Sequence, residues 1–187
     1  MNYERTATAE SPITLDVVKD HLYVRHAKHD KLIERYLNAA LLLGEKYTGK
    51  DFRVSTWKVT ADYFFELECL ERAPIDAITE VTYTVSGSPV VVASSTYYLV
   101  KQKQWAEIHL DTGNEKEWPT DGDVRIGSVT ATFTTDPAEY AELIVPAMLQ
   151  HVAWTYENRG DDSVHSAKGI EMSGAASFYD RFRTARI

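Results

Sequence analysis

Residues 29–52 read HDKLIERYLNAALLLGEKYTGKDF, and this stretch marks where the chain changes from helical to strand periodicity. Its apolar side chains recur at the i, i+3, i+4, i+7 and i+8 spacing of one helix face, at Ile33, Tyr36, Leu37, Ala40 and Leu41. Asp30 is a suitable N-cap, and Gly49 supplies a stop because glycine adopts the left-handed conformation that ends many helices. We therefore predict a helix over residues 31–48 whose apolar stripe faces a core.

Beyond Phe52 the apolar pattern changes to a period of two, which is the period of a half-buried strand. The alternation runs through residues 63–69, 81–85, 106–110 and 129–134. Turn residues separate these segments, as in Ser-Gly-Ser-Pro at 86–89. The stretch from about 52 to 134 is therefore predicted to be a block of antiparallel strands.

Helical signals stand on both sides of this block. Thr14 can cap the first amides of a short helix over residues 14–24. Pro146 removes a backbone donor and clashes with the preceding turn, so it would break a helix that ran straight through. We expect a short helical turn at 137–143 and a separate helix over 146–159.

The two ends of the chain lack a periodic pattern. Residues 1–10 are polar and are expected to be loose, while residues 160–176 are small, polar and glycine-bearing and are expected to be flexible. The order helix, helix, strands, helix and tail predicts an α+β fold. In it, the N-terminal and C-terminal helices form a small helical bundle with an inserted antiparallel β-block. Residues 1–160 would form one domain, and residues 161–187 an extended, flexible C-terminal tail.

Composition narrows the classes of function. Hydrophobic residues make up 44% of the chain and charged residues 26%, which is typical of a globular protein with its own core. No run approaches the roughly 18 apolar residues of a membrane span, and the first residues lack the apolar stretch of a signal peptide. The net charge of −8 disfavours sequence-specific binding to nucleic acid, which needs a basic face. We expect no membrane partner.

Few residues are arranged for catalysis. His21, His26, His29 and Asp30 are of the types that bind a divalent metal, but their spacing places no two imidazoles on one helical face. Cys69 has no histidine in a recognisable relation to it and is expected to be a small buried side chain. We therefore expect no enzyme activity, no metal and no cofactor. A metal-dependent enzyme that uses the histidines at 21–30 stays open as the weaker alternative.

The predicted helix 146–159 has two different faces. Its apolar face comprises Met148, Leu149, Val152 and Tyr156. His151, Trp154 and Asn158 lie elsewhere on the helix. A helix of this kind is contacted on two sides, by its own core and by a neighbour, and aromatic residues are enriched in interface cores. We interpret His151 as a packing and hydrogen-bonding residue without a catalytic role.

Three segments resemble the head–tail connector family of long-tailed bacteriophages, whose members are also called adaptor or head-completion proteins. The first is ITLDVVKDHLYV, with Lys19, His21 and Leu22, and the second is the helix end Tyr47-Thr48-Gly49. The third is VPAMLQHVAWTYENRG. Its matching residues are Pro146, Ala147, His151, Trp154, Tyr156, Glu157, Asn158 and Arg159. The similarity covers roughly residues 12–160 in order and spacing, and the β-block with Arg-Ala-Pro-Ile at 72–75 stands in the expected place.

The resemblance implies a structural virion protein at the head–tail junction. Such proteins form a ring, usually twelvefold, under the portal, connect the DNA-filled head to the tail and continue the DNA channel. The implied partners are the portal protein, neighbouring copies of the chain and a stopper or tail-completion protein. DNA would pass through without sequence-specific binding, and assembly would take place in the bacterial host cytoplasm. A stopper or tail-terminator ring of the same neck is the main alternative.

The resemblance also implies three contact regions. The family's C-terminal tail tends to reach toward the portal, and the corresponding candidates are Phe178, Tyr179, Arg181, Phe182 and Arg183. The residues expected between subunits are His151, Trp154, Asn158 and Arg159. The loop 111–123 is expected to face the tail through Asn114, Lys116 and Trp118. Two features depart from the family: this loop is long, and the ending AASFYDRFRTARI lacks the family's leucine-rich, proline-containing stretch.

Overall fold

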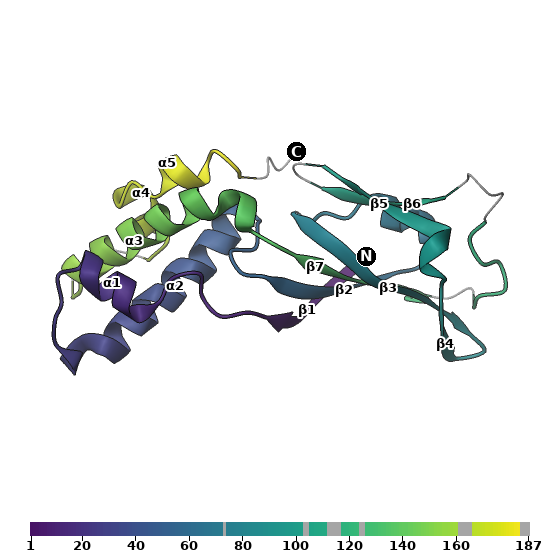
Figure 1. Cartoon of the computed structure of the whole chain (residues 1–187), viewed down its shortest axis with the longest axis horizontal. Coiled ribbons are helices and arrows are strands. Elements are labelled where there is room, and N and C mark those ends of the chain that lie inside the picture. The colour runs from purple at the N-terminus through teal and green to yellow at the C-terminus, as the bar shows by residue number, and fades with distance from the viewer. Residues whose placement is uncertain (73, 103–104, 112–116, 124–125, 161–165, 184–187) are drawn as a thin grey trace. The chain divides into compact units, whose positions relative to one another are not determined.

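The structure, a computed structural model, describes all residues except 73, 103–104, 112–116, 124–125, 161–165 and 184–187. The chain divides into two compact units (Figure 1). Unit 1 comprises Met1–Ala9 and Arg53–Asp136, and unit 2 comprises Glu10–Phe52 and Pro137–Ile187. The strands therefore interrupt a helical unit that is built from both ends of the chain. The predicted α+β class with an inserted antiparallel β-block is confirmed.

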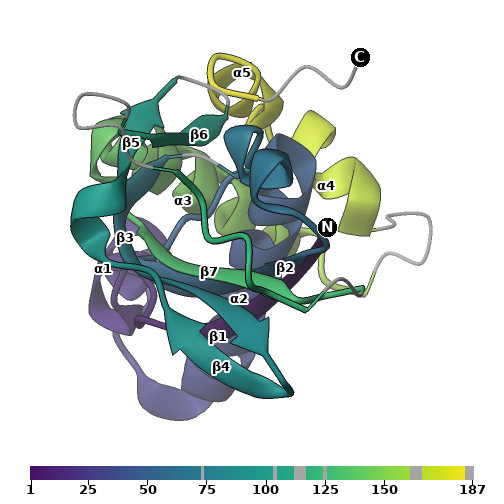
Figure 2. The same cartoon turned by 90° about the vertical axis from the view of Figure 1, so that its right-hand side faces the viewer.

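Unit 1 holds a five-stranded antiparallel sheet in the order β1-β2-β7-β3-β4. Its strands are β1 Asn2–Thr8, β2 Ser55–Ala61, β3 Ile75–Val85, β4 Ser88–Val91 and β7 Val129–Thr135. A two-stranded ribbon, β5 Tyr97–Lys101 and β6 Ala106–Leu110, lies over one face of this sheet (Figures 1 and 2). The buried core between sheet and ribbon includes Val59, Leu67, Leu70, Val81, Ile108, Ala131 and Phe133.

The alternation in the sequence decides which face of the sheet is buried. The antiparallel register pairs Trp57 with Phe133 and Val59 with Ala131, so apolar side chains of β2 and β7 meet on the inner face. The residues between them are mostly threonines and lie on the opposite, partly exposed face. The predicted turn at 86–89 joins β3 to β4. Ser86 and Gly87 have φ of 50° and 83°, the left-handed pair of a tight hairpin.

Unit 2 is a cluster of helices. They are α1 Leu15–His21, α2 Asp30–Thr48, α3 Ala141–Glu157, α4 Ser166–Met172 and α5 Ala176–Tyr179. The two long helices, α2 and α3, lie side by side (Figure 1). Their buried face includes Ile33, Leu37, Leu41, Ala147, Met148 and Val152. Among the described helices, none is long and apolar enough to cross a membrane.

The helix boundaries follow the predicted signals at the start of α1 and the end of α2, but Asp30 is the first residue of α2 and not its N-cap, which is His29. The Asp30 carboxylate pairs with Lys19 instead. The Thr14 hydroxyl accepts a hydrogen bond from the Val17 amide, at 3.5 Å, and caps α1. Gly49 ends α2 with a φ of 72°, the left-handed conformation that only glycine adopts without strain. Short 3₁₀ turns complete the fold at η1 Ala27–His29, η2 Phe64–Glu68, η3 Ser94–Thr96 and η5 Ala138–Tyr140.

The predicted break at Pro146 is wrong. Helix α3 begins at Ala141 and continues through Pro146 to Glu157. The missing amide costs one hydrogen bond, but Ile144, Ala147 and Met148 on both sides of the proline are fully buried. Burial of Ile144 and Met148 offsets the lost bond, because each of these two side chains is worth about 1.5 to 3 kcal/mol.

The prediction of an extended, flexible C-terminal tail is also wrong for the residues that the structure describes beyond Gly160. Residues 166–172 and 176–179 are helical, and Tyr179 and Phe182 are buried in the core of unit 2. The polar and small residues from which the tail was predicted lie among apolar side chains at 170, 175, 179 and 182, which all belong to this core. The steps from 175 to 179 and from 179 to 182 are the four and three residues of a helix face.

Three further predictions in unit 1 are wrong. The segment 63–69 is not a strand: its residues 64–68 form the turn η2, and Phe64, Leu67 and Leu70 point inward at a spacing of three, the repeat of a 3₁₀ turn. Cys69, expected to be buried, is exposed. Residues 2–8, expected to be loose, form the edge strand β1.

Candidate assembly surfaces

Helix α3 is contacted on two sides, as its sequence indicates, but both contacts come from the chain itself. The His151 side chain is 2% exposed. A Cβ atom added to Gly169 of α4 would lie 2.8 Å from the His151 Nε2 atom, so the backbone of α4 packs directly on the imidazole. His151 is therefore covered within unit 2, and the protomer does not offer it to a neighbouring subunit.

The environment of His151 favours the neutral imidazole. Burial lowers the pKa of His151 to about 4, because the charged form would lose its hydration. Its Nδ1 atom has no hydrogen-bond partner among the described residues. A histidine without an orienting acid is a poor general base, so this position supports packing.

The other three residues expected between subunits lie at the C-terminal end of α3. Trp154 and Asn158 are half-buried, and the Asn158 amide donates to the Trp154 carbonyl at 2.8 Å. Arg159 is exposed; its guanidinium lies 4.4 Å from the centre of the Tyr156 ring and donates to the Tyr156 carbonyl. These residues remain available as a contact surface, and their role between subunits stays a prediction.

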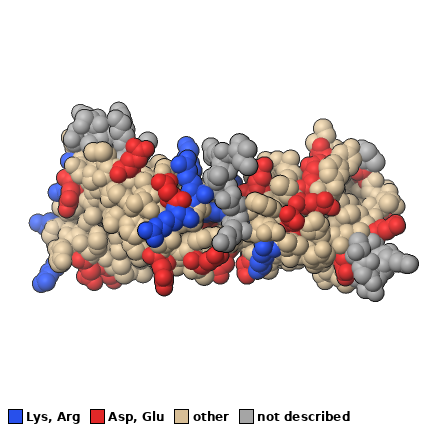
Figure 3. Space-filling view, turned by 90° about the horizontal axis from the view of Figure 1, so that it is seen from above, with Lys and Arg blue, Asp and Glu red and all other residues tan. Residues whose placement is uncertain are grey.

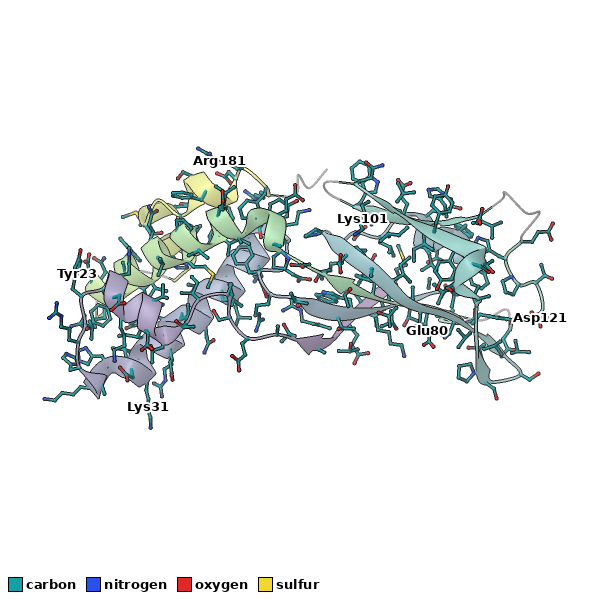
Figure 4. All side chains as sticks on the ribbon, viewed as in Figure 1. Tyr23, Lys31, Glu80, Lys101, Asp121 and Arg181 are labelled. Carbon is teal, nitrogen blue, oxygen red and sulfur yellow. The ribbon has the colours of Figure 1, made fainter. Side chains whose placement is uncertain are left out.

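The five candidates for portal contact fall into two groups. Tyr179 and Phe182 are buried, and Phe178 packs against the same core, so these aromatic side chains hold α5 onto unit 2. Arg181 and Arg183 are exposed, and Figure 4 shows Arg181 at the surface, just after the end of α5. The surface of this segment is therefore basic, while its aromatic residues face inward.

Polar contacts also fasten this segment to α2. The Tyr47 hydroxyl donates to Asp180 at 2.9 Å, and the Arg183 guanidinium lies 4.5 Å from the centre of the Tyr47 ring. Burial, and then the hydrogen bond to Asp180, raise the pKa of Tyr47. The residues after α4 therefore form part of the fold of unit 2.

The described arm of the loop 111–123 folds back onto unit 1. The Trp118 ring stacks on Phe64 at 4.6 Å and on Tyr97 at 6.2 Å between ring centres, so it lies in an aromatic cluster and not at an exposed tip. The Asp123 carboxylate accepts hydrogen bonds from the amides of Ser86 and Gly87 in the β3–β4 turn. The predicted tail-side residues Asn114 and Lys116 lie outside the described residues, and the tail-side role stays a prediction.

Among the described residues, those of the α1–α2 connection included, no group of three or more side chains that could ligate a metal is found. His29 Nδ1 lies 2.6 Å from the Tyr156 hydroxyl of α3, and the His26 ring meets the His29 ring edge-on at 4.8 Å. Lys19 pairs with Asp30 at 2.7 Å. These contacts tie the connection to the helices, which is a structural use of His26 and His29.

A cleft of about 140 Å³ lies in unit 1 beside the turn η2, lined in part by Asp62, Phe64 and Tyr83. Ligand pockets commonly measure about 300 to 1,000 Å³. This cleft is therefore smaller than a usual binding pocket for a small molecule or cofactor. The exposed surfaces of the chain are the stronger candidates for its functional contacts.

One surface feature was missed in the sequence. On the outward face of the β5–β6 ribbon, the Glu107 carboxylate accepts a hydrogen bond from Trp105 Nε1 at 2.8 Å and one from His109 Nε2 at 2.6 Å. The Tyr98 ring stacks on His109, with ring centres 5.9 Å apart. We call Tyr98, Trp105, Glu107 and His109 the Trp105 patch. The outward positions of the alternation in 106–110, read together with Trp105, would have revealed it.

Charge is spread unevenly over the surface. Figure 3 shows acidic side chains scattered over the face it draws, with no continuous basic strip among the described residues. In unit 2, Arg25, Lys28 and Lys31 are exposed around the α1–α2 connection, next to Tyr23, which is 89% exposed and has a φ of 55°. Figure 4 shows Lys31 pointing away from α2. This end of unit 2 is a small basic surface on an acidic chain.

The architecture defines a class: a helical unit made from both chain ends, interrupted by an antiparallel sheet with a covering ribbon. No protein-family model matches the chain, and no curated protein matches it. Solved structures of this class, however, match along the whole chain.

These structures come from a gene transfer agent (GTA) particle. A chain in the virion of the native particle matches with a TM-score of 0.69 and 21% identity. Chains in the neck of the empty particle, computed with C6 symmetry, and of the native particle, computed with C12 symmetry, match with TM-scores of 0.72 and 0.71 and identities of 19% and 20%. Each match covers 100% of this chain and 97% of the other. The chain therefore shares its complete fold with a chain of the GTA neck, as the head–tail connector resemblance led us to expect.

Proposed function

We propose that the chain is a structural virion protein of a phage-like particle, and that copies of it form a ring in the neck, between the portal and the tail. The observation that carries this proposal is the end-to-end likeness to chains in neck structures. Both units take part in that likeness, since it spans 100% of the chain. The C12 symmetry of one neck structure supports twelve copies in the ring.

The charge of the chain fits this role. Twelve copies of a chain with a net charge of −8 give an acidic assembly through which DNA can slide without adhering. The connector acts as an adaptor that extends the DNA channel below the portal and offers its other side to a stopper or tail-completion protein. DNA passes through without sequence-specific contacts.

The contact to the portal is assigned to the basic surface of the C-terminal segment. Arg181 is exposed, whereas Tyr179 and Phe182 are required for the core of unit 2. Removal of the whole segment would therefore unfold part of the protein, and a single charge reversal is the sharper test. Arg181→Glu changes the surface, and Lys58→Glu changes an exposed cation of β2 by the same amount as a matched control.

Mass photometry of the purified chain, alone and mixed with the portal of the same particle, tests the proposal. Twelve chains of 21.2 kDa add about 254 kDa to the portal. We expect this increase for the parent chain and for Lys58→Glu, and a weaker increase for Arg181→Glu. A chain that stays monomeric and adds no mass to the portal would contradict the adaptor role. Binding to a tail-completion protein but not to the portal would favour the stopper or tail-terminator ring instead.

A further inference from the structure

The β5–β6 ribbon has an outward face of unusual composition. Its inward side chains, among them Ala106 and Ile108, are buried in the core of unit 1. Its outward side carries the Trp105 patch, in which Tyr98 is 51% exposed and Trp105 is 43% exposed. Two large aromatic side chains therefore stand on a strand surface that solvent reaches.

The five-stranded sheet of the same unit provides a comparison. The outward positions of its strands β2 and β7 carry Lys58 and the threonines Thr56, Thr60, Thr130, Thr132 and Thr134. These two strands place no aromatic side chain on that face. Trp and Tyr are instead the residue types that dominate the binding energy of interfaces. The contrast indicates that the ribbon face has a partner.

The side chains of the patch are held in place before any partner arrives. Glu107 binds Trp105 through one carboxylate oxygen and His109 through the other, and Tyr98 stacks on His109. Side chains that are already ordered lose less conformational entropy on binding, which strengthens an interface. The hydrogen bonds from His109 and Trp105 also lower the pKa of Glu107, so its carboxylate stays ionised.

The chemistry of the patch fits a cation. A carboxylate flanked by Trp and Tyr rings attracts an ammonium or guanidinium group, both by charge and through the ring faces. The same chain displays exposed cations, at Arg25, Lys28 and Lys31 of the basic end of unit 2. Copies that each carry a net charge of −8 repel one another, so a contact between copies needs such a pairing of unlike groups.

We infer that the Trp105 patch is one half of the contact between neighbouring copies in the ring, and that it receives a Lys or Arg side chain of the next copy. This inference rests on the proposed function. A ring requires two different, complementary surfaces on every copy, and an anionic aromatic patch and an exposed cation meet this requirement.

The test uses the full chain, assembled as a ring, in three variants. Trp105→Ala removes the exposed indole, Glu107→Gln removes the charge and keeps the shape, and Phe65→Ala removes a more exposed aromatic side chain of unit 1, outside both proposed surfaces, as the matched control. Mass photometry over a dilution series gives the concentration at which the ring dissociates. We expect Trp105→Ala and Glu107→Gln to raise this concentration about tenfold or more, and Phe65→Ala to leave it unchanged.

A photo-crosslinking amino acid at position 105 gives a second readout that does not depend on stability. Irradiation of the ring should produce a chain dimer, and mass spectrometry should find the crosslink next to a Lys or Arg. A crosslink to portal or tail protein alone, or rings that dissociate alike with and without the two substitutions, would overturn the inference and leave the proposed function intact. A parent chain that forms no ring would overturn the proposed function, and the inference with it.

Discussion

The buried histidine of α3 should make the stability of the protein depend on pH in a defined window. His151 is 2% exposed, and burial lowers its pKa from 6.5 to about 4. The folded state therefore keeps the imidazole neutral, while the unfolded chain binds a proton below pH 6.5. Above pH 6.5 both states are neutral and this residue adds no pH dependence.

The direction and the size of the change in stability follow from the pKa values of His151 in the folded and unfolded states. As the pH falls from 6.5 to about 4, the unfolded state gains protons and the free energy of unfolding falls by about 1.4 kcal/mol per pH unit. The total loss from His151 is about 3 kcal/mol, and the dependence levels off below pH 4. Such a loss is a large fraction of the stability of an ordinary domain, about 5 to 15 kcal/mol.

Urea unfolding of the parent chain and of His151→Leu, followed by circular dichroism between pH 7.5 and pH 4.5, measures this effect. The leucine has similar volume and does not titrate, so the difference between the two chains isolates His151 from the carboxylates. We expect the variant to gain stability relative to the parent by about 2 to 3 kcal/mol over this range. His21→Leu, which changes an exposed histidine, should show no such gain. Parallel pH profiles of parent and His151→Leu would refute the reasoning.

Three further substitutions test the packing of unit 2. Gly169→Ala places a methyl group 2.8 Å from His151 Nε2, so urea unfolding should show a loss of about 1 to 3 kcal/mol. Thr14→Ala removes the cap on the Val17 amide and should cost about 0.5 to 1 kcal/mol, with a lower thermal midpoint; an unchanged midpoint would contradict the capping role. Tyr179→Phe deletes a buried hydroxyl that has no partner among the described residues, so the unfolding free energy should stay equal or rise. A large loss for Tyr179→Phe would mean that the hydroxyl is hydrogen-bonded.

The long helix and most strands could be predicted because their signals are local. The stripe from Ile33 to Leu41 and the glycine at 49 define α2 without any other part of the chain. The alternation at 129–134 defines β7 in the same way. These segments satisfy periodicity and end signals together, and long-range packing then has little freedom to change them.

The wrong predictions depend on contacts that are distant in sequence. Strand β1 exists because it pairs with β2, from Asn2 with Thr60 to Thr8 with Ser55, and residues 2–8 carry no signal of that partner. Helix α3 continues through Pro146 because the residues on both sides of the proline are buried against other helices. The helical C-terminal segment is fixed by the insertion of Tyr179 and Phe182 into a core most of whose other residues lie more than one hundred positions earlier or on α3.

The prediction of contact residues is limited in the same way, by packing between segments that are distant in sequence. The sequence indicated that α3 has a second contacting surface, and the structure fills that surface at His151 with α4 of the same chain. Without a prediction for α4, a neighbouring subunit was the natural interpretation. The Trp105 patch differs: Trp105, Glu107 and His109 share one side through alternation that is visible in the sequence, and only Tyr98 is added by strand pairing, opposite His109.

Electron cryomicroscopy of the chain bound to the portal of its own particle tests the central claim most directly. We predict a closed ring of twelve copies, coaxial with the portal, with a central channel wide enough for DNA. Single copies scattered on the portal, or a portal that carries no density for the chain, would contradict a ring-forming neck protein.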